Sequence, residues 1–397
     1  MTLVIAIFVA PFAVLTLCFA LEVAVGLRPL RRLPTVRADR PLEAVIVVPA
    51  HDEAAILKTR LLALKDAVRE RARILVVADN CSDSTAAIAR DLEIEVVERF
   101  DEQCRGKGFA LDFARDHLRT EPPMVVMIID ADCVTDARSI DVLVNQCVAT
   151  GRPCQATYLQ TPALDSAPTV QLSTFAFYIK NVIRQRAVQR LAGRAHLLGT
   201  GMAFPWSIFE QADLATADIV EDLKLGHDLA RTGHPPLFVE DATVWSSAET
   251  EAATLSQRSR WEGGFLRHAL RSGPPMLLRS LASGDIGGLW AAINVMIPPF
   301  ALLILLDFAV LVLAALAAWL TGARLWPVAV LGISILLAAI GLSAAWLSGG
   351  SRFIRLSALV RAPFYLAWKL PMYLRFAREG GPREWTRTSR SDAPKEI

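Results

Sequence analysis

The sequence is poor in the side chains that build zinc and disulfide centres. It has 6 cysteines and 6 histidines in 397 residues, with no C-x-x-C pair and no histidines at zinc-binding spacing. Structural zinc sites use ligands at short paired spacings, and disulfide frameworks occur mainly in small secreted domains. The spacing therefore argues against both classes and indicates a reducing compartment for the middle of the chain.

The sequence also lacks an excess of either charge. It has 42 basic and 40 acidic residues and a net charge of +2, so no bulk attraction for nucleic acid is expected. Apolar residues instead make up 53% of the chain, and the mean hydropathy is +0.37. They concentrate at the N-terminus and after about residue 289, and the length suits two or three structural units.

Three apolar segments predict three membrane spans. The first, Leu3 to Leu21, is close to the roughly 20 residues that cross a hydrocarbon core. A cleaved signal peptide is the alternative, but no basic region precedes this run and the run is long for a signal sequence. Two further spans are predicted at 300–320 and 326–347, after a short segment that ends at Pro298 and Pro299, because proline interrupts helices.

The distribution of positive charge predicts the orientation of these spans. Arginines follow the first apolar run and basic residues follow the third, and positive flanks stay cytoplasmic. The segment at 351–380 is rich in basic and aromatic residues, a composition that is typical of a helix lying in the membrane interface. A fourth span is the alternative for this segment. The predicted organisation is a transmembrane helix at 1–27, a cytoplasmic domain at 41–270, an interfacial segment with two transmembrane helices at 271–350, a basic amphipathic interfacial helix at 351–380 and a disordered tail at 381–397.

The middle of the chain alternates short apolar runs with helical patterns. Strands of continuous apolar character between helices predict an α/β fold with a mostly parallel sheet covered on both faces. Ser82 is the predicted N-cap of one helix. The expected strands are 44–48, 74–77, 94–97 and 125–129, and the expected helices are 57–68, 83–92 and 108–118.

Acidic clusters follow the first, second and fourth of these strands, at 49–53, 79–83 and 130–133. Ligands bind at the carboxyl ends of such strands, and neighbouring carboxylates repel unless a cation lies between them. Oxygen ligands suit Mg2+ or Mn2+, which commonly hold a diphosphate, and the R-G-K-G segment at 105–108 adds two cations. For any single cluster, helix capping and turn chemistry are the favoured explanation. Together they predict a metal and diphosphate site.

The motifs V-V-P-A-H-D-E, V-A-D-N-C-S-D-S-T, R-G-K-G, D-A-D-C, V-E-D-L-K-L-G and Q-R-S-R-W occur in that order between about residues 43 and 265. This ordered set resembles the family 2 inverting glycosyltransferases of GT-A fold, most closely the membrane-bound polysaccharide and glycolipid synthases. The resemblance implies a Rossmann-like sheet with flanking helices, a UDP-sugar donor, a divalent metal (Mg2+ or Mn2+) and a hexosyl transfer with inversion.

The resemblance also implies roles for individual residues, which fall into four groups. Asp79 is expected to hydrogen-bond the uracil ring, and Asp222 is the expected general base on the acceptor hydroxyl. The donor-nucleotide site is expected to contain Pro49, His51, Glu53, Asp79, Arg105, Lys107 and Asp130. The metal ligands are expected to be Asp132 and Asp130. The acceptor and diphosphate contacts are expected from Gly199, Thr200, Gly201, Glu221, Gln257, Arg260 and Trp261.

The sequence departs from the family pattern at two positions. Asp52 stands where the family usually has Asn, and Val220 stands where Thr is common. Asp222 is predicted in a first helical turn, where an acid is also stabilised by the helix dipole; Asp218 and Asp228 are alternative bases.

The Q-R-S-R-W residues at 257, 260 and 261 share one helical face. They could contact phosphate and sugar, or they could form an Arg–Trp packing pair.

The predicted function is transfer of a sugar to a lipid, lipid-linked or polysaccharide acceptor at the cytoplasmic face of a bacterial inner membrane. The main alternative is a subunit of a processive exopolysaccharide synthase that needs partner proteins, since three spans would hardly enclose a channel for a polar chain. An inactive binding subunit and a nucleotidyl or lipid-phosphate transferase are further alternatives. Asp307, inside a predicted span, is either functional or paired with Asn294 or a neighbouring helix.

Overall fold

The computed structural model describes residues 1–31, 43–69, 72–247 and 251–379. The chain forms two compact units. Of the described residues, the helical unit comprises Met1–Arg28, Pro162–Ala192 and residues 258–379, and the sheet unit comprises those within Pro29–Thr161 and Gly193–Gln257. By its contacts Pro162–Ala192 belongs to the helical unit, while the domain boundaries expected from the sequence stay a prediction. The expected disordered tail at 381–397 lies outside the described residues.

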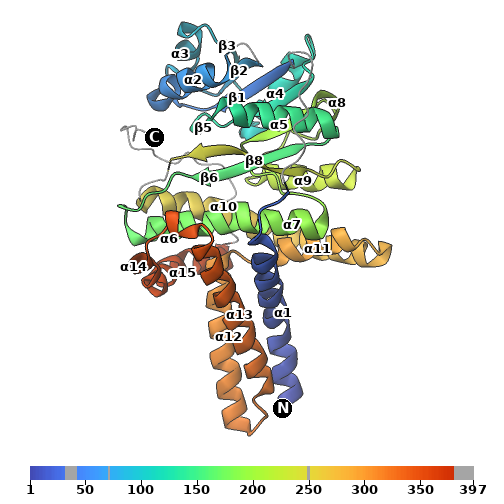
Figure 1. Ribbon diagram of the computed structural model, residues 1–397, viewed down its shortest axis with the longest axis vertical. Coiled ribbons are helices and arrows are strands. Elements are labelled where there is room, and N and C mark those ends of the chain that lie inside the picture. The colour runs from blue at the N-terminus through green and yellow to red at the C-terminus, as the bar shows by residue number, and fades with distance from the viewer. Residues whose placement is uncertain (32–42, 70–71, 248–250, 380–397) are drawn as a thin grey trace. The chain divides into compact units, whose positions relative to one another are not determined.

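The sheet unit contains one eight-stranded sheet in the order β3-β2-β1-β4-β7-β6-β8-β5 (Figure 1). Strands β3, β2, β1 and β4 run parallel, and β7 pairs antiparallel with both β4 and β6. The expected mostly parallel α/β sheet is confirmed. The strands are β1 (Ala44–Ala50), β2 (Ala72–Asp79), β3 (Glu95–Arg99), β4 (Val125–Ile128), β5 (Cys133–Thr135), β6 (Cys154–Gln160), β7 (Met202–Pro205) and β8 (Leu237–Ser246).

Helices pack against the apolar faces of this sheet. Its first strands are buried along almost their whole length, as expected for strands covered on both faces. One face forms a core with α4, α8 and α9, and α2 and α5 also contact the sheet. The helices of this unit are α2 (Ala54–Val68), α3 (Thr85–Asp91), α4 (Lys107–Leu118), α5 (Ala137–Thr150), α8 (Trp206–Phe209) and α9 (Glu221–Arg231).

One detail of this unit differs from the prediction. Helix α3 begins at Thr85 with Ser84 as its N-cap residue, so Ser82 is not the cap. Ser82 instead lies in the loop after β2, where its backbone N–H donates to Asp52.

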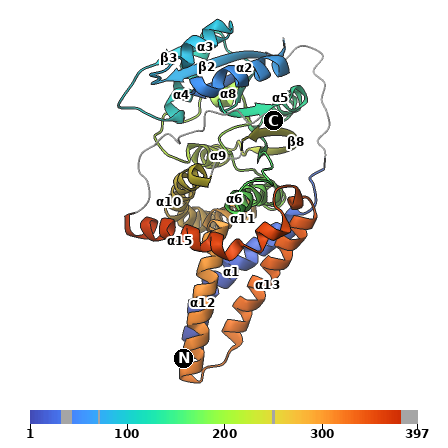
Figure 2. The same cartoon turned by 90° about the vertical axis from the view of Figure 1, so that its left-hand side faces the viewer.

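Among the residues that the structure describes, three helices are long and apolar enough to cross a membrane, and all belong to the helical unit: α1, α12 and α13. They lie side by side in both views (Figures 1 and 2), and the break before α12 falls at Pro298 and Pro299, as predicted. The helices of this unit are α1 (Thr2–Gly26), α6 (Pro168–Tyr178), the π-helix η1 (Ile179–Arg184), α7 (Gln185–Ala192), α11 (Ile286–Met296), α12 (Phe300–Thr321), α13 (Trp326–Leu347), η2 (Gly350–Arg352), α14 (Leu356–Leu359), α15 (Ala362–Glu379) and the part of α10 (Glu251–Ser283) from Arg258 onward.

Asp307 on α12 is buried and accepts a hydrogen bond from the Thr16 hydroxyl of α1 at 2.7 Å. The expected pairing with a neighbouring helix is therefore correct. Asn294 is not that partner, because its side-chain amide donates to the Glu22 carboxylate at 2.6 Å.

Helix α1 is held closely against the π-helix and α7. The Arg184 Nε donates to the Glu22 carboxylate at 2.6 Å, and Gly26 lies so near Ile183 that an added Cβ would be 1.9 Å from the Ile183 carbonyl oxygen. Two further arginines of α7 donate to carbonyls at the end of α1. These carbonyls have no partner within their own helix, so the arginines stabilise the end of α1.

We expect Gly26→Ala to destabilise the helical unit by about 1–3 kcal/mol or more, because overpacking at a backbone contact forces the helices apart. Gly332→Ala on α13 is the matched control, since a Cβ there meets nothing within 4 Å. Thermal unfolding of both variants in detergent checks this. Equal melting temperatures for the two variants would contradict the close packing of α1.

Candidate functional site

The acidic clusters after β1, β2 and β4 follow neighbouring parallel strands and so lie at one edge of the sheet. They divide into two groups of potential ligand atoms. One group is Asp52, Cys81 and Asp83, and the other is Asp130, Asp132 and Cys133; within each group the ligand atoms lie within 4.8 Å of one another. The convergence of all three clusters on one cation stays a prediction.

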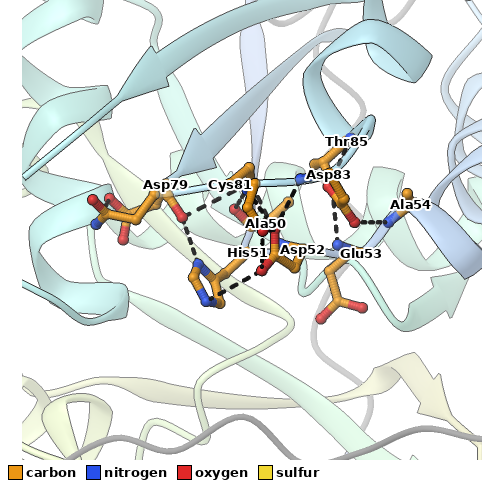
Figure 3. A network of polar contacts seen from close by, with 11 residues as sticks. Ala50, His51, Asp52, Glu53, Ala54, Asp79, Cys81, Asp83 and Thr85 are labelled. Carbon is orange, nitrogen blue, oxygen red and sulfur yellow. Dashed lines mark hydrogen bonds and ion pairs between the residues drawn. The ribbon is translucent and has the colours of Figure 1, made fainter.

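In the first group, Asp52 joins the loop after β1 to the loop after β2. Its carboxylate oxygen Oδ1 accepts the backbone N–H of Ser82 at 2.7 Å and that of Asp83 at 3.3 Å, and its own N–H lies 3.4 Å from the Cys81 sulfur. Figure 3 shows Asp52 beside Cys81 and Asp83. Asp52 thus serves as a backbone acceptor within the protein.

Asp83 caps the starts of two helices. One carboxylate oxygen accepts the Thr85 N–H at 2.9 Å, and the other accepts the Ala54 N–H at 3.0 Å. The Glu53 N–H donates to the Thr85 hydroxyl at 2.9 Å, while the Glu53 carboxylate points away from this network (Figure 3). For Asp83 the capping interpretation therefore holds, and for Asp52 the turn interpretation holds.

Asp79, at the end of β2, is buried and held by an arginine that sequence reasoning missed. Its Oδ1 forms an ion pair of 2.7 Å with Arg99, and Arg99 also donates to the Cys104 carbonyl at 2.7 Å. The His51 Nδ1 lies 2.7 Å from the Asp79 carbonyl oxygen. Arg99 is the last residue of β3. Ligands are expected at the carboxyl ends of the strands, and the same expectation for the third strand would have included Arg99.

The second group is built around Lys107, at the start of α4. Its ammonium donates to the Asp130 carboxylate and to the Gly199 carbonyl at 2.7 Å. A Cβ added at Gly199, which has φ +87°, would lie 3.4 Å from an Asp222 carboxylate oxygen and 3.5 Å from the Lys107 nitrogen. Asp130, Lys107, Asp222 and the turn at Gly199 therefore meet in one place, although they come from distant parts of the sequence.

The turn at Gly199 is braced by two side chains. The Asp130 N–H donates to the Thr200 hydroxyl at 3.0 Å. Gln155, fully buried in β6, donates to the Thr200 carbonyl and accepts the Leu198 N–H, both at 2.9 Å. Sequence reasoning missed Gln155, which lies in a strand with two other buried polar residues and whose buried amide needs partners.

The charges around Lys107 shift one another's titration. Burial and the neighbouring Asp222 raise the pKa of Glu221 to about 8, and Lys107 acts in the opposite direction. Burial acts against the charge on Lys107, but Asp130 and Glu221 outweigh it and raise the pKa of Lys107. Near neutral pH Glu221 is therefore protonated, and the neighbouring Lys107 is charged and forms an ion pair with Asp130.

Asp222 lies in the first turn of α9, as predicted. Its carboxylate accepts the Leu223 N–H at 2.8 Å, and an acid at this position is stabilised by the helix dipole. The local backbone therefore orients the Asp222 carboxylate near Gly199.

The donor set at Asp130 and Asp132 fits a hard divalent cation. Their carboxylates lie next to the Cys133 sulfur, but burial and the charges of Asp132 and Asp130 raise the pKa of the Cys133 thiol well above its usual value. A thiol that stays protonated is a poor metal ligand. The remaining oxygens are of the type that Mg2+ and Mn2+ prefer.

The remaining predicted site residues are divided between the two units. Pro49 is half-buried in β1 and Arg105 is exposed. Gln257 ends the sheet unit, whereas Arg260 and Trp261 belong to the helical unit. The Trp261 ring packs 6.0 Å from the Phe177 ring and 5.6 Å from the Arg258 guanidinium, so it takes part in an Arg–Trp packing pair, with Arg258 as the arginine.

Residues 41–264 match the sequence model of a family described as "Glycosyltransferase like family 2". Among solved structures, a mannosyltransferase from Pyrobaculum calidifontis in complex with GDP-mannose and Mn2+ aligns with 92% of this chain and 99% of its own, at 18% identity and a TM-score of 0.54. Glucosyl-3-phosphoglycerate synthase from Mycobacterium tuberculosis, with Mn2+, UDP and phosphoglyceric acid, aligns with 55% of this chain and 78% of its own, at 17% identity and a TM-score of 0.35. No curated protein sequence matches. The first of these structures supports the fold.

We expect Asp52→Ala to destabilise the protein by about 1–3 kcal/mol, because two backbone N–H groups lose their acceptor. Asp52 also has φ +52°, a conformation that Asn and Asp tolerate better than Ala. Asp52→Asn is the matched control and should retain most of the stability. Thermal unfolding compares the three proteins, and equal losses for Ala and Asn would contradict the acceptor role.

The raised pKa of Glu221 predicts a pH dependence of stability in the metal-free protein. Protonated Glu221 favours the folded state, so its contribution is full below the ordinary pKa of 4.5 and is lost as the pH rises towards 8. Glu221→Gln removes this loss. The melting temperature of the variant relative to the wild type should therefore increase between pH 5 and pH 8; a constant difference would be inconsistent with the shift.

Proposed function

The chain belongs to the glycosyltransferase-like family 2, and from this premise we propose that it is a membrane-bound inverting enzyme. It moves a sugar from a UDP-sugar to a lipid, lipid-linked or polysaccharide acceptor. The observation that carries the proposal is the meeting of Asp130, Lys107, Gly199 and Asp222 in one place.

Asp130 and Asp132 are the residues that would hold the divalent cation, Mg2+ or Mn2+. When bound, this ion neutralises the charge that develops on a leaving diphosphate. Lys107 fixes the Asp130 carboxylate and the Gly199 turn at the same time. It thereby orients the first acid of D-A-D-C against the turn that borders Asp222.

Asp222 is the proposed general base, which accepts the proton of the acceptor hydroxyl as the sugar is transferred. Its position beside Gly199 supports this role. Glu221, whose pKa is raised to about 8, stays neutral near pH 7. The positive charge of Lys107 therefore pairs with the Asp130 carboxylate.

At the other end of the site, Asp79 is the proposed acceptor for an N–H of the nucleotide base. The Arg99 ion pair supports this role because it fixes the orientation of the carboxylate. The mannosyltransferase from Pyrobaculum calidifontis was solved with GDP-mannose, so GDP-sugars belong in a donor test beside UDP-sugars.

The helices α1, α12 and α13 support a membrane location. The arginines that follow α1 in the sequence favour a cytoplasmic sheet unit, and we propose the inner membrane of a bacterium. Three such helices favour a transferase that does not secrete its product. The motif Q-R-S-R-W favours the second candidate, a subunit of a processive synthase that works with partner proteins.

The base assignment is tested by release of nucleoside diphosphate from UDP- and GDP-sugars in membranes containing Mg2+ or Mn2+. We expect Asp222→Asn to lower turnover by about 100-fold or more, the usual contribution of general base catalysis, while donor binding remains. Asp218→Asn, at an exposed position four residues earlier, is the control and should stay active. If Asp222→Asn turns over undiminished, Asp222 is not the general base. If only Asp218→Asn loses turnover, Asp218 is the general base instead.

A further inference from the structure

Helix α15 buries a polar face. Tyr365, Lys369 and Tyr373 recur every four residues and so share one side of the helix, and all three are buried, Lys369 with only 2% of its surface exposed. The Lys369 ammonium donates to one oxygen of Glu262, and the Tyr373 hydroxyl donates to the other at 2.6 Å. Glu262 belongs to α10, so the polar face of α15 is turned toward α10.

The opposite face of α15 is exposed and apolar. Phe364, Leu370 and Leu374 are 78%, 43% and 49% exposed. This outer face consists of Pro363, Phe364, Ala367, Leu370, Pro371 and Leu374, and it contains every exposed position between 363 and 374. A surface helix of a water-soluble protein has the reverse arrangement. The helix is therefore built with its polar side inward and its apolar side outward.

The outer face is turned toward the side on which α12 and α13 extend. In both views α10 lies on one side of α15, and the bodies of α12 and α13 run away from α15 on the other side (Figures 1 and 2). Helix α15 also packs against α12. Because the polar face contacts α10, the apolar face looks along the direction of the membrane-crossing helices.

The outer face adds to an exposed apolar surface on α12, which also needs a lipid or protein partner. Helix α12 exposes large apolar side chains, among them Val312 at 63% and Trp319 at 77%. An exposed apolar area of this extent requires a lipid or protein partner. Exposed arginines, Arg361 before the face and Arg375 and Arg378 after it, are suited to anionic headgroups.

We propose that the outer face of α15 lies in the hydrocarbon edge of the bilayer, with the helix parallel to the membrane plane. The Glu262–Lys369 pair then holds α15 to α10 from the protein side, and the arginines at its ends contact anionic lipid headgroups. The proposal rests on the membrane location inferred above and is independent of the transfer chemistry. Residues 380–397 are a poor alternative cover, because this stretch is mostly charged and polar.

The test places nitroxide labels on the full-length protein in vesicles of phosphatidylethanolamine and phosphatidylglycerol. Labels at Leu370→Cys and, independently, Phe364→Cys probe the outer face, in a background in which the half-buried cysteines Cys18, Cys81 and Cys104 are serines. Leu313→Cys, 56% exposed on α12, is the lipid control, and Asp116→Cys, exposed on α4, is the water control. Collision rates with oxygen and with a water-soluble nickel chelate are measured by electron paramagnetic resonance.

We expect both labels on the outer face to have an oxygen-to-nickel ratio close to that of the lipid control and severalfold above that of the water control. A ratio like the water control means that the face is solvated, and low access to both reagents means that protein covers it; either result overturns the proposal. If the Leu313→Cys label also behaves like the water control, the membrane location fails with it. Loss of transferase activity alone leaves these ratios unchanged.

Discussion

Mutual repulsion of carboxylates is the constraint on which the sheet unit depends. The parallel strands β1, β2 and β4 deliver acids to one edge, and each acid there needs a compensating partner. Asp79 has the Arg99 guanidinium, Asp52 has backbone N–H groups and Asp130 has the Lys107 ammonium. Lys107 affects the site most, because its second hydrogen bond, to the Gly199 carbonyl, also positions the turn that borders Asp222.

Local pattern was sufficient to predict the elements that form this edge. Continuous apolar runs identified β1, β2 and β4, and the acid pair before an amphipathic run identified the first turn of α9 at Asp222. Non-local pairing was out of reach: the position of Arg99 at a strand end could be noted, but nothing in the sequence pairs it with Asp79, twenty residues earlier, or marks Gln155 as the brace of the turn at Gly199. The division of the acids into a capping group and a metal-type group likewise depends on which backbone N–H groups lie nearby, and only the folded chain determines that.

The helical unit follows a different rule, since its buried acids bind side chains of neighbouring helices. Glu22 binds both Arg184 and Asn294, Asp307 accepts from Thr16, and Glu262 binds Lys369. Composition alone indicated that the basic and aromatic residues near the C-terminus lie at an interface, but it could not determine which face of α15 looks inward. The spacing of Tyr365, Lys369 and Tyr373 shows only that they share one face of the helix. That this face looks inward is known only once a carboxylate on another helix is seen to contact it.

Asp52 illustrates how geometry gives a physical reason for a departure from a family pattern. The position requires a side-chain oxygen that accepts two backbone N–H groups and a residue that tolerates a positive φ. Asn and Asp both supply these properties, so the exchange of one for the other preserves the loop on which His51 and Glu53 are carried. The carboxylate at this position is directed at the protein's own backbone, and it therefore contributes to the site by fixing the shape of the two loops.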